Sequence, residues 1–226
     1  MSASEHDDRN GRDAHNERMR AQLASGAWTD AADASLMRDH ERAVAVMRRY
    51  NTDPDLDDAA REALLRDLFG AFGERSSLTT GAQVDYGYNI RVGKRCFFNY
   101  NCVFLDGAPI TFGDDVWVGP NCSFVTPLHP LVGRERAMRI DGDGVSHLWE
   151  RDLPITVGDD VWIASNVTVN PGVTIGEGAV IGSGSVVTKD VPSRTIAFGN
   201  PCRVARAITE DDSIEDALAA AGLLAR

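Results

Sequence analysis

A chain of 226 residues, 43% of them apolar, is long enough for one domain with its own core and a small appendage. Its formal net charge of −11 excludes a general binder of nucleic acids or anionic membranes, because such partners would repel it. No run of 18 apolar residues occurs, and the charged N-terminus has no apolar segment behind it. We therefore expect no transmembrane helix and no signal peptide, hence a cytoplasmic protein.

The first 74 residues are predicted to precede the main domain as a tail and a helical segment. Residues 1–16 are polar and are expected to form a disordered tail. Residues 17–74 are expected to be helical, with helices over 18–28, 34–51 and 56–73. Pro54 separates the last two helices, since proline cannot continue a helix. This helical segment is expected to cap one end of the domain that follows.

A strict period of six residues occupies the last third of the chain. An aliphatic residue recurs at Val157, Ile163, Val169, Ile175, Ile181 and Val187, and a small or β-branched residue follows each of them four positions later. A helix repeats every 3.6 residues and a strand every 2, so neither explains this period. A period of six is typical of a chain wound into a three-sided coil with its aliphatic residues inside. We therefore predict a mainly β fold, a parallel β-helix over residues 75–207.

The interruptions of the period divide this domain. Toward the N-terminus the period extends back to about Asp85, with a two-residue slip between Ile110 and Phe112. It breaks over 126–153, and repeat proteins often place functional loops at such breaks. Residues 208–226 are expected to form a C-terminal amphipathic helix, with Ser213 as the candidate N-cap.

The four cysteines lack the spacing of a zinc site. Cys96, Cys102 and Cys122 fall four residues after an aliphatic or aromatic position of the period, which is the small inward slot. We expect them to pack as small apolar residues and to form neither a disulfide nor a metal site.

Two histidines lie within the interrupted stretch. His129 stands at its mouth, directly before Pro130, and is the candidate catalytic residue. His147 lies deeper, among glycines and aspartates, and we do not expect it to be catalytic. The remaining three are expected to be solvated surface residues, namely His6, His15 and His40.

A local excess of positive charge follows the last repeat. Four basic residues lie here against one acidic residue, Asp190: Lys189, Arg194, Arg203 and Arg206. In a chain of net charge −11, this segment indicates either a site for a small polyanion or a basic surface stripe paired with acidic neighbours.

The most specific segments of the chain are YNTDPDLDDAAREALLRDLFG, VDYGYNIRVG, FFNYNCVFLD, ITFGDDVWVGPN, TPLHP, PITVGDDVWIASNVTVNPGVTIG, GSGSVVTKDVP and GNPCRVAR. Together they resemble the bacterial hexapeptide-repeat O-acetyltransferases, and the resemblance covers residues 19–207. The helical prefix joined to DYGYNI and to the N-x-N-C-x-x-L-D pattern is similar to the maltose and galactoside acetyltransferase branch.

The resemblance implies a left-handed parallel β-helix that forms a homotrimer, with each active site between neighbouring coils. It implies that His129 is the general base and that the sugar acceptor is contacted by Asp30, Asp85, Asn99 and Asp106. Acetyl-CoA would be the co-substrate, with no metal, and would be bound by Trp162, Ser165, Ser183, Thr188, Lys189, Arg203 and Arg206.

These residue types suit direct acetyl transfer. A neutral imidazole can take the proton of a sugar hydroxyl as that hydroxyl attacks the thioester, an effect worth roughly 10²–10⁴ in rate. The negative charge that develops on the thioester oxygen needs a donor, and the backbone N–H near Ser165 is the candidate. The resemblance places Lys189, Arg203 and Arg206 at the phosphates of CoA, which would explain the basic segment.

Two departures from the family pattern lie on the acceptor side. The sequence ahead of DYG reads GAQV, and the stretch from His129 to Pro154 is longer than usual. The acceptor could therefore be a sugar such as maltose, glucose or a galactoside, or else an amino sugar, an antibiotic or another small alcohol.

Two other classes of coil protein fit the sequence less well. A metal enzyme similar to the γ-class carbonic anhydrases needs three interface histidines, but only His129 and His147 lie in the coil region. A non-catalytic trimeric scaffold would need neither a histidine at the loop mouth nor the basic segment.

Overall fold

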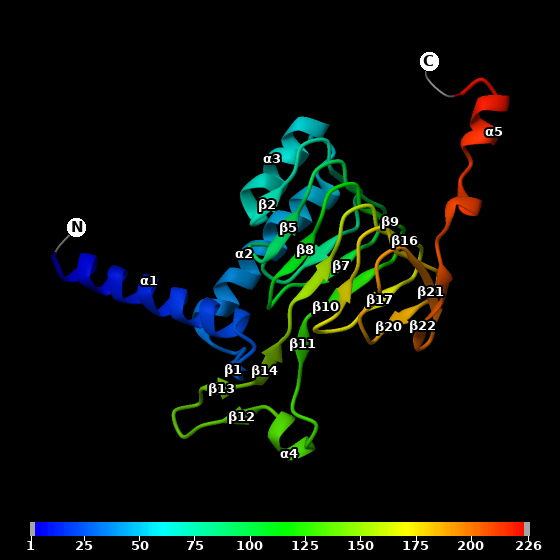
Figure 1. The fold of residues 1–226 in the computed structure, drawn as a ribbon. Coiled ribbons are helices and arrows are strands. Elements are labelled where there is room, and N and C mark those ends of the chain that lie inside the picture. The colour runs from blue at the N-terminus through cyan, green and yellow to red at the C-terminus, as the bar shows by residue number, and fades with distance from the viewer. Residues whose placement is uncertain (1–2, 224–226) are drawn as a thin grey trace.

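The computed structural model, which describes residues 3–223, shows a three-sided parallel β-helix with helices at its N-terminal end (Figure 1). An arm, residues 126–153, projects from the side of the coil. The prediction of a mainly β parallel coil is confirmed. No helix within the described residues is long and apolar enough to cross a bilayer.

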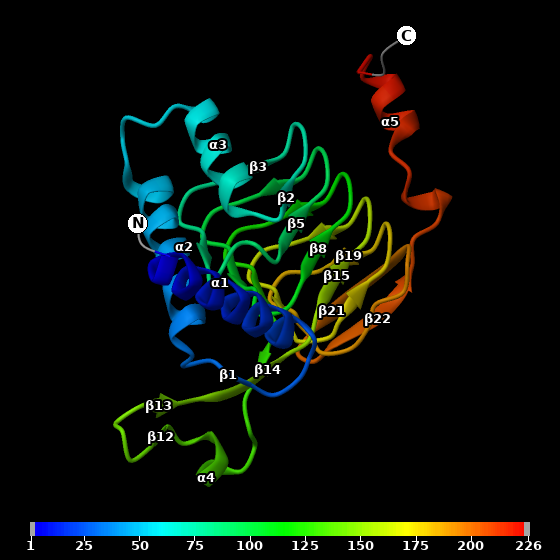
Figure 2. The ribbon, with the colours of Figure 1, turned by 90° about the vertical axis from the view of Figure 1, so that its left-hand side faces the viewer.

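Three parallel sheets form the sides of the coil, and the chain visits them in turn (Figure 2). The first sheet contains β2 (Ala71–Phe72), β5 (Ile90–Val92), β8 (Ile110–Phe112), β15 (Ile155–Val157) and β18 (Thr174–Ile175). The second contains β3 (Ser77–Leu78), β6 (Phe97–Phe98), β9 (Trp117–Val118), β16 (Trp162–Ile163), β19 (Val180–Ile181) and β21 (Thr195–Gly199), with β22 (Cys202–Ala207) antiparallel at its edge. The third contains β4 (Gln83–Val84), β7 (Val103–Leu105), β10 (Ser123–Val125), β17 (Thr168–Val169) and β20 (Val186–Val187).

The period of six is the packing rule of the core. All six aliphatic residues of the last third point inward and are at most 1% exposed. Burying one such side chain stabilises the fold by roughly 1.5–3 kcal/mol. In the N-terminal half several of the inward positions hold aromatic rings. Phe98 packs edge-on against Phe112, with ring centres 4.8 Å apart. Cys96, Cys102 and Cys122 are buried free thiols, as predicted.

The turns of the coil have two lengths. Ala71, Arg91 and Thr111 align in the first sheet, so a turn in the N-terminal half takes 20 residues. Thr156 and Thr174 align across a turn of 18 residues. In each 20-residue turn the two extra residues lie at the corner between the third and first sheets. They account for the two-residue slip of the period between Ile110 and Phe112. Because Ala71 already belongs to a rung, the coil begins earlier than the predicted residue 75, and the helix predicted over 56–73 ends at Leu68.

Side chains also connect the turns at the corners. At the corner between the second and third sheets, Asn101, Asn121 and Asn166 all have φ near 59°, a conformation that asparagine tolerates well. The Nδ2 of Asn101 donates to Oδ1 of Asn121 at 3.2 Å, and Asn121 donates in the same way to Asn166 at 3.3 Å. This ladder runs parallel to the coil axis.

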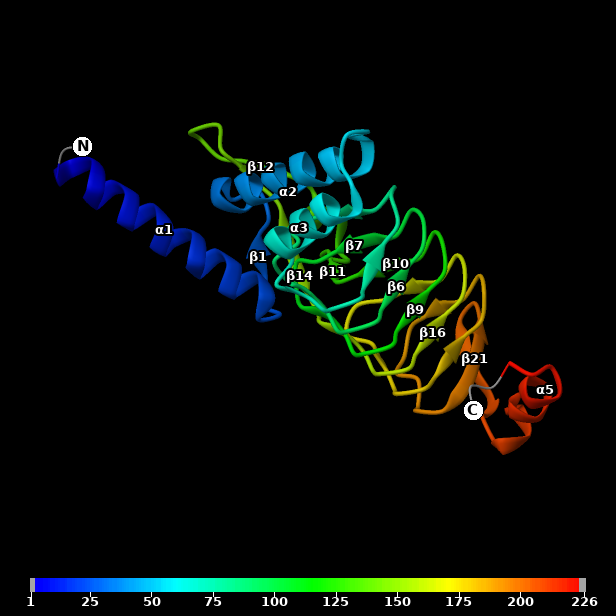
Figure 3. The same cartoon turned by 90° about the horizontal axis from the view of Figure 1, so that it is seen from above.

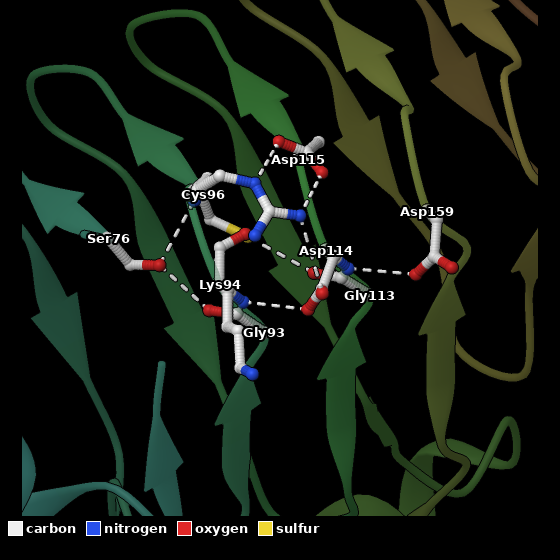
Figure 4. A network of polar contacts seen from close by, with 9 residues as sticks. Ser76, Gly93, Lys94, Cys96, Gly113, Asp114, Asp115 and Asp159 are labelled. Atoms are coloured by element: carbon white, nitrogen blue, oxygen red, sulfur yellow. Dashed lines mark hydrogen bonds and ion pairs between the residues drawn. The ribbon is translucent and has the colours of Figure 1, made fainter. Parts of the chain in front are cut away.

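The corner between the first and second sheets is held by charged side chains (Figure 4). Asp114 accepts from the backbone N–H of Lys94, and its own N–H donates to Asp159, both at 2.8 Å. Arg95 forms a bidentate pair with Asp115, with N···O distances of 2.7 and 2.5 Å. Each contact joins one turn to the next.

The helical segment consists of α1 (Ala3–Ala24), α2 (Ala34–Thr52) and α3 (Asp58–Leu68). Helix α3 closes the coil, since Leu65 and Leu68 join the main core. Figure 3 shows α1 and the C-terminal helix at opposite ends of the coil. The tail predicted to be disordered over 1–16 is helical from Ala3, while residues 1–2 lie outside the described part. The second half of α1 is tied to α2, because Arg20 pairs with Asp39 at 2.7 Å.

The arm carries secondary structure of its own. It contains β11 (Pro127–Leu128), α4 (Gly133–Arg136), β12 (Arg139–Ile140), β13 (Ser146–His147) and β14 (Trp149–Asp152). Strands β12 and β13 form a hairpin, and β14 lies between β11 and β1 (Thr29–Asp30), antiparallel to both. The arm is thereby joined to the segment between α1 and α2.

The C-terminal segment is only partly helical. It comprises a 3-10 turn (Glu210–Asp212) and α5 (Glu215–Ala220), which ends before the predicted residue 226. Residues 224–226 lie outside the described part. The N-cap position is Ile214, while the hydroxyl of Ser213 accepts from the N–H of Glu215 at 3.3 Å.

Candidate active site

His129 is exposed at the base of the arm, directly after β11. Its Nδ1 lies 3.4 Å from the backbone oxygen of Trp149. Since a carbonyl oxygen can only accept, this contact places the hydrogen on Nδ1 and leaves the lone pair on Nε2. The geometry therefore prepares Nε2 to take a proton from a bound molecule.

Three carboxyl groups gather around the base of the arm. Asp152 is fully buried, and its Oδ1 accepts from the hydroxyl of Thr126 at 2.8 Å. Burial raises the pKa of Asp152 to about 6, and the negative charge of Asp85 adds to the effect, while Thr126 and His129 oppose it. Burial also raises the pKa of Glu150 to about 8, with further contributions from Asp152 and Asp85.

Glu150 is therefore largely protonated near pH 7, and a protonated carboxyl group can donate as well as accept a hydrogen bond. We call the set of Asp85, His129, Glu150 and Asp152 the histidine corner, because it lies where the third sheet meets the first. Such groups can orient hydroxyls beside a general base.

Asp85 connects the histidine corner to a cavity. Burial raises its pKa, while nearby His40 lowers it. The Nδ1 of His40 lies 3.0 Å from the backbone oxygen of Asp85 and 3.7 Å from its Oδ1. Both residues line a cavity of about 470 Å³ between α2 and the third sheet, with an apolar wall that includes Met47 and Leu105.

The prediction that His40 is only a solvated surface residue is therefore wrong. No local pattern could have found it, since its contact with Asp85 joins residues 45 positions apart.

Asp106 has a different environment from the one predicted. It is fully buried, and its two oxygens accept from the backbone N–H groups of Asp85, Tyr86, Gly87 and Asn89 at 3.1, 2.8, 2.7 and 3.4 Å. Burial raises the pKa of Asp106 to about 7 against the opposing effect of these bonds. The carboxyl group stabilises the turn over 85–89 and offers no surface to an acceptor. This environment favours support of the turn, and the contact of Asp106 with a sugar stays a prediction.

Asp30 is also occupied by the protein itself. Its Oδ1 accepts from the backbone N–H of Leu148 at 2.9 Å, and its Oδ2 lies 2.6 Å from Nδ1 of His147. The predicted contact of Asp30 with a sugar would have to compete with both of these partners in the arm.

Three of the predicted cofactor residues, Trp162, Ser165 and Ser183, lie along a second site, at the corner between the second and third sheets. A cavity of about 310 Å³, here called the groove, brings together Asn99, Trp162, Ser165 and Ser183. Its wall is a row of aromatic residues in register on consecutive turns, Phe97, Trp117 and Trp162. Trp117 is 61% exposed and Trp162 54% exposed, so the row leaves aromatic surface open to a ligand.

The basic residues lie at the C-terminal end of the coil. Thr188 and Lys189 follow β20 and are exposed, as are Arg203 and Arg206 on β22. Arg206 forms a bidentate pair with Asp212, with both N···O distances 2.7 Å. A phosphate at Arg206 would therefore share this guanidinium with a carboxylate or displace it.

One chain does not bring all the predicted residues together. His129 and Asp85 lie beyond the C-terminal ends of the strands of the third sheet, where it meets the first. Asn99, Ser165 and Ser183 lie before the N-terminal ends of those strands, where it meets the second. A single chain thus carries two half-sites, the histidine corner and the groove. Within residues 3–223, no group of three or more histidines, cysteines or acids is arranged to hold a metal ion.

Two family models match the chain. The model described as bacterial transferase hexapeptide (six repeats) matches residues 154–189. The model described as maltose acetyltransferase hexapeptide capping motif matches residues 22–73, which span the end of α1, α2 and α3.

Known proteins resemble the chain over most of its length. It is 36% identical over 171 residues to the galactoside O-acetyltransferase of Escherichia coli, covering 76% of this chain and 80% of that protein. A solved maltose O-acetyltransferase from Clostridium difficile 630 is 40% identical, with a TM-score of 0.77 over 85% of this chain and 98% of that one. A hexapeptide-repeat acetyltransferase from Vibrio cholerae, solved with acetyl-CoA, is 37% identical, with a TM-score of 0.74 over 84% and 98% of the two chains.

Proposed function

The chain belongs to the maltose and galactoside O-acetyltransferase family of hexapeptide-repeat acetyltransferases, and we propose that it moves the acetyl group of acetyl-CoA directly to a sugar hydroxyl, with His129 as general base. The observation that carries this proposal is the contact between Nδ1 of His129 and the carbonyl of Trp149, which leaves Nε2 as a proton acceptor. A sugar hydroxyl is a poor nucleophile near neutral pH and needs such a base.

The reaction needs no covalent intermediate on the protein, since the thioester is already activated. Nε2 of His129 takes the proton while the hydroxyl oxygen bonds to the acetyl carbon, and the same proton passes to the sulfur as the carbon–sulfur bond breaks. The backbone N–H of Ser165, at the rim of the groove, is the candidate donor to the oxygen that becomes negative.

The donor would lie along the groove. Trp162 provides an exposed aromatic ring beside Ser165 and Ser183, and Arg203 and Arg206 lie on β22 toward the C-terminal end of the coil. Thr188 and Lys189 also lie toward that end, but they follow β20, at the corner between the third and first sheets. Basic side chains bind phosphate groups through charge-assisted hydrogen bonds. This arrangement supports a CoA molecule with its phosphates at the basic end and its thioester near Asn99.

The acceptor would lie at the histidine corner, where Asp85 and Glu150 can orient hydroxyl groups. Asn99 would contact it from the groove side. We propose maltose, glucose or a galactoside as the acceptor. An amino sugar is the second candidate, because an ammonium group beside Asp85 and Glu150 would favour the charged form of these carboxyl groups, whose pKa values burial raises.

We also infer a homotrimer in which each active site combines two chains. In one chain the histidine corner and the groove lie at opposite ends of the strands of the third sheet, so they cannot form one active site together. A neighbouring coil that presents its groove to this histidine corner would bring base, acceptor and thioester together.

An acceptor screen tests the proposed function. Release of the CoA thiol would be followed with glucose, maltose, galactosides and amino sugars, for the wild type and for His129→Ala. We expect thiol release that depends on the sugar and falls by about 10²-fold or more in the variant, while acetyl-CoA binding by calorimetry stays unchanged. Wild-type turnover in His129→Ala would contradict the assignment of the base.

A further inference from the structure

His147 links the hairpin of the arm to β1 through a pair of carboxylates. Its Nδ1 lies 2.6 Å from Oδ2 of Asp30, and its Nε2 lies 3.4 Å from Oδ2 of Asp141. Ionised carboxylates only accept hydrogen bonds, so an imidazole that donates to both must carry a hydrogen on each nitrogen. These two bonds raise the pKa of His147, the bond to Asp30 more than the bond to Asp141.

Asp30 extends this contact into the backbone of the arm. Its other oxygen, Oδ1, accepts from the N–H of Leu148, and the N–H of Ala31 donates to the oxygen of Leu148 at 2.7 Å. In the pairing of β1 with β14, Asp30 stands opposite Trp149. The carboxylate of Asp30 thus holds the side chain of His147 and the backbone of Leu148.

Trp149 connects this cluster to the catalytic base. Its ring stacks on that of His147, with centres 6.3 Å apart and planes inclined by 11°. Its backbone oxygen is the atom that lies 3.4 Å from Nδ1 of His129. Any shift of β14 away from β1 would move this oxygen and release the imidazole of His129.

The charged surroundings of His147 are mostly acidic. Asp30 comes from β1, and Asp141 belongs to the hairpin turn, where Asp143 also lies. Arg139 stands opposite His147 across the hairpin, and Glu150 follows on β14. The two carboxylates in contact outweigh the single opposing arginine, so the site favours the imidazolium form.

We propose that Asp30 and His147 form a latch that holds β14 against β1 and thereby positions His129 for proton transfer. In this latch both act as positioning residues, through Trp149 and His129. The inference rests on the proposed function of His129 as general base. It gives the long arm a role in the reaction that the repeat itself does not supply.

The latch predicts a specific pattern in the kinetics. Removing either partner lets β14 move, and small displacements of a catalytic group can lower turnover by up to about 10²-fold. We therefore expect His147→Gln and Asp30→Asn each to lower kcat by about tenfold, with KM for acetyl-CoA within about twofold of wild type in both and KM for the sugar within about twofold in His147→Gln. The double variant should be no slower than either single variant, since both break one contact.

The pH profile adds a readout that a purely structural role would not move. In the wild type kcat should fall at high pH as His147 loses one proton, because the neutral imidazole keeps an N–H for Asp30 but loses the bond to Asp141 and the positive charge, which weakens the latch. Glutamine has no such proton, so His147→Gln should lack this fall. The matched control is Asp143→Asn in the same hairpin, which should leave kcat and its pH profile unchanged.

Hydrogen exchange of the peptide over 145–152 would show the latch directly. We expect faster exchange in His147→Gln and Asp30→Asn, with the β-helix peptides unaffected. If His147→Gln left kcat and its pH profile at wild-type values, the latch would be wrong, whatever Asp30→Asn does to the KM for the sugar. Full activity of His129→Ala would refute the proposed function itself, a separate outcome.

Discussion

Replacement of Asp106 tests whether its carboxyl group holds the turn or contacts an acceptor. Two of its four bonds are short, from the N–H groups of Tyr86 and Gly87 at 2.8 and 2.7 Å. A hydrogen bond of this kind contributes about 1–3 kcal/mol, depending on the charge of the acceptor. Asp106→Ala leaves both buried donors without a partner, so we expect a loss of about 2–6 kcal/mol in the free energy of unfolding.

Urea unfolding followed by circular dichroism, at equal protomer concentrations, measures this loss. Asp106→Asn keeps one acceptor oxygen and should lose about half as much as the alanine variant. A loss below about 1 kcal/mol in Asp106→Ala, together with a raised KM for the acceptor, would refute the reasoning and return Asp106 to the acceptor site.

Three further predictions concern the donor, the histidine corner and the core. Arg203→Ala combined with Arg206→Ala should raise the KM for acetyl-CoA by about tenfold or more with little change in kcat, and an unchanged KM in initial-rate assays would remove the phosphate assignment. The folded-state pKa of Glu150, about 8, lies above its ordinary 4.5, so the protein loses stability as pH rises between these values. Glu150→Gln should therefore be more stable than wild type by about 1–3 kcal/mol at pH 8 and no more stable at pH 4, as thermal melts would show; equal gains at both pH values would contradict this. Ile175→Ala should cost about 2–5 kcal/mol by leaving a cavity, whereas exposed Thr174→Ala should cost under about 1 kcal/mol in the same melts.

The coil could be predicted from the sequence because its geometry repeats. Each inward position, such as Val169 or Ile181, sees nearly the same environment as the next, so six-residue spacing alone identifies the core. The cysteines follow the same rule, since Cys102 and Cys122 occupy equivalent inward slots.

The contacts of the candidate site could not be predicted in this way. His147 meets Asp30 across 117 positions of sequence, and no local period links them. Asp106 shares the sequence pattern of a ligand contact, and only its burial reveals that backbone groups occupy its oxygens. The helix that begins at Ala3 was not predicted because its polar composition favours disorder. The contact between Arg20 and Asp39, which ties this helix to α2, joins residues 19 positions apart and leaves no local pattern in the sequence.

The central claim is that one chain supplies the base and its neighbour the donor site. Two inactive variants test it most directly when they are co-expressed with different tags and purified as mixed trimers. One is His129→Ala, and the other is Ser183→Trp, which fills the groove. A mixed trimer holds two chains of one variant and one of the other, so one of its three sites joins an intact histidine corner to an intact groove, and about a third of wild-type turnover should return. Mixed trimers without activity would contradict the claim and place base and donor on the same chain.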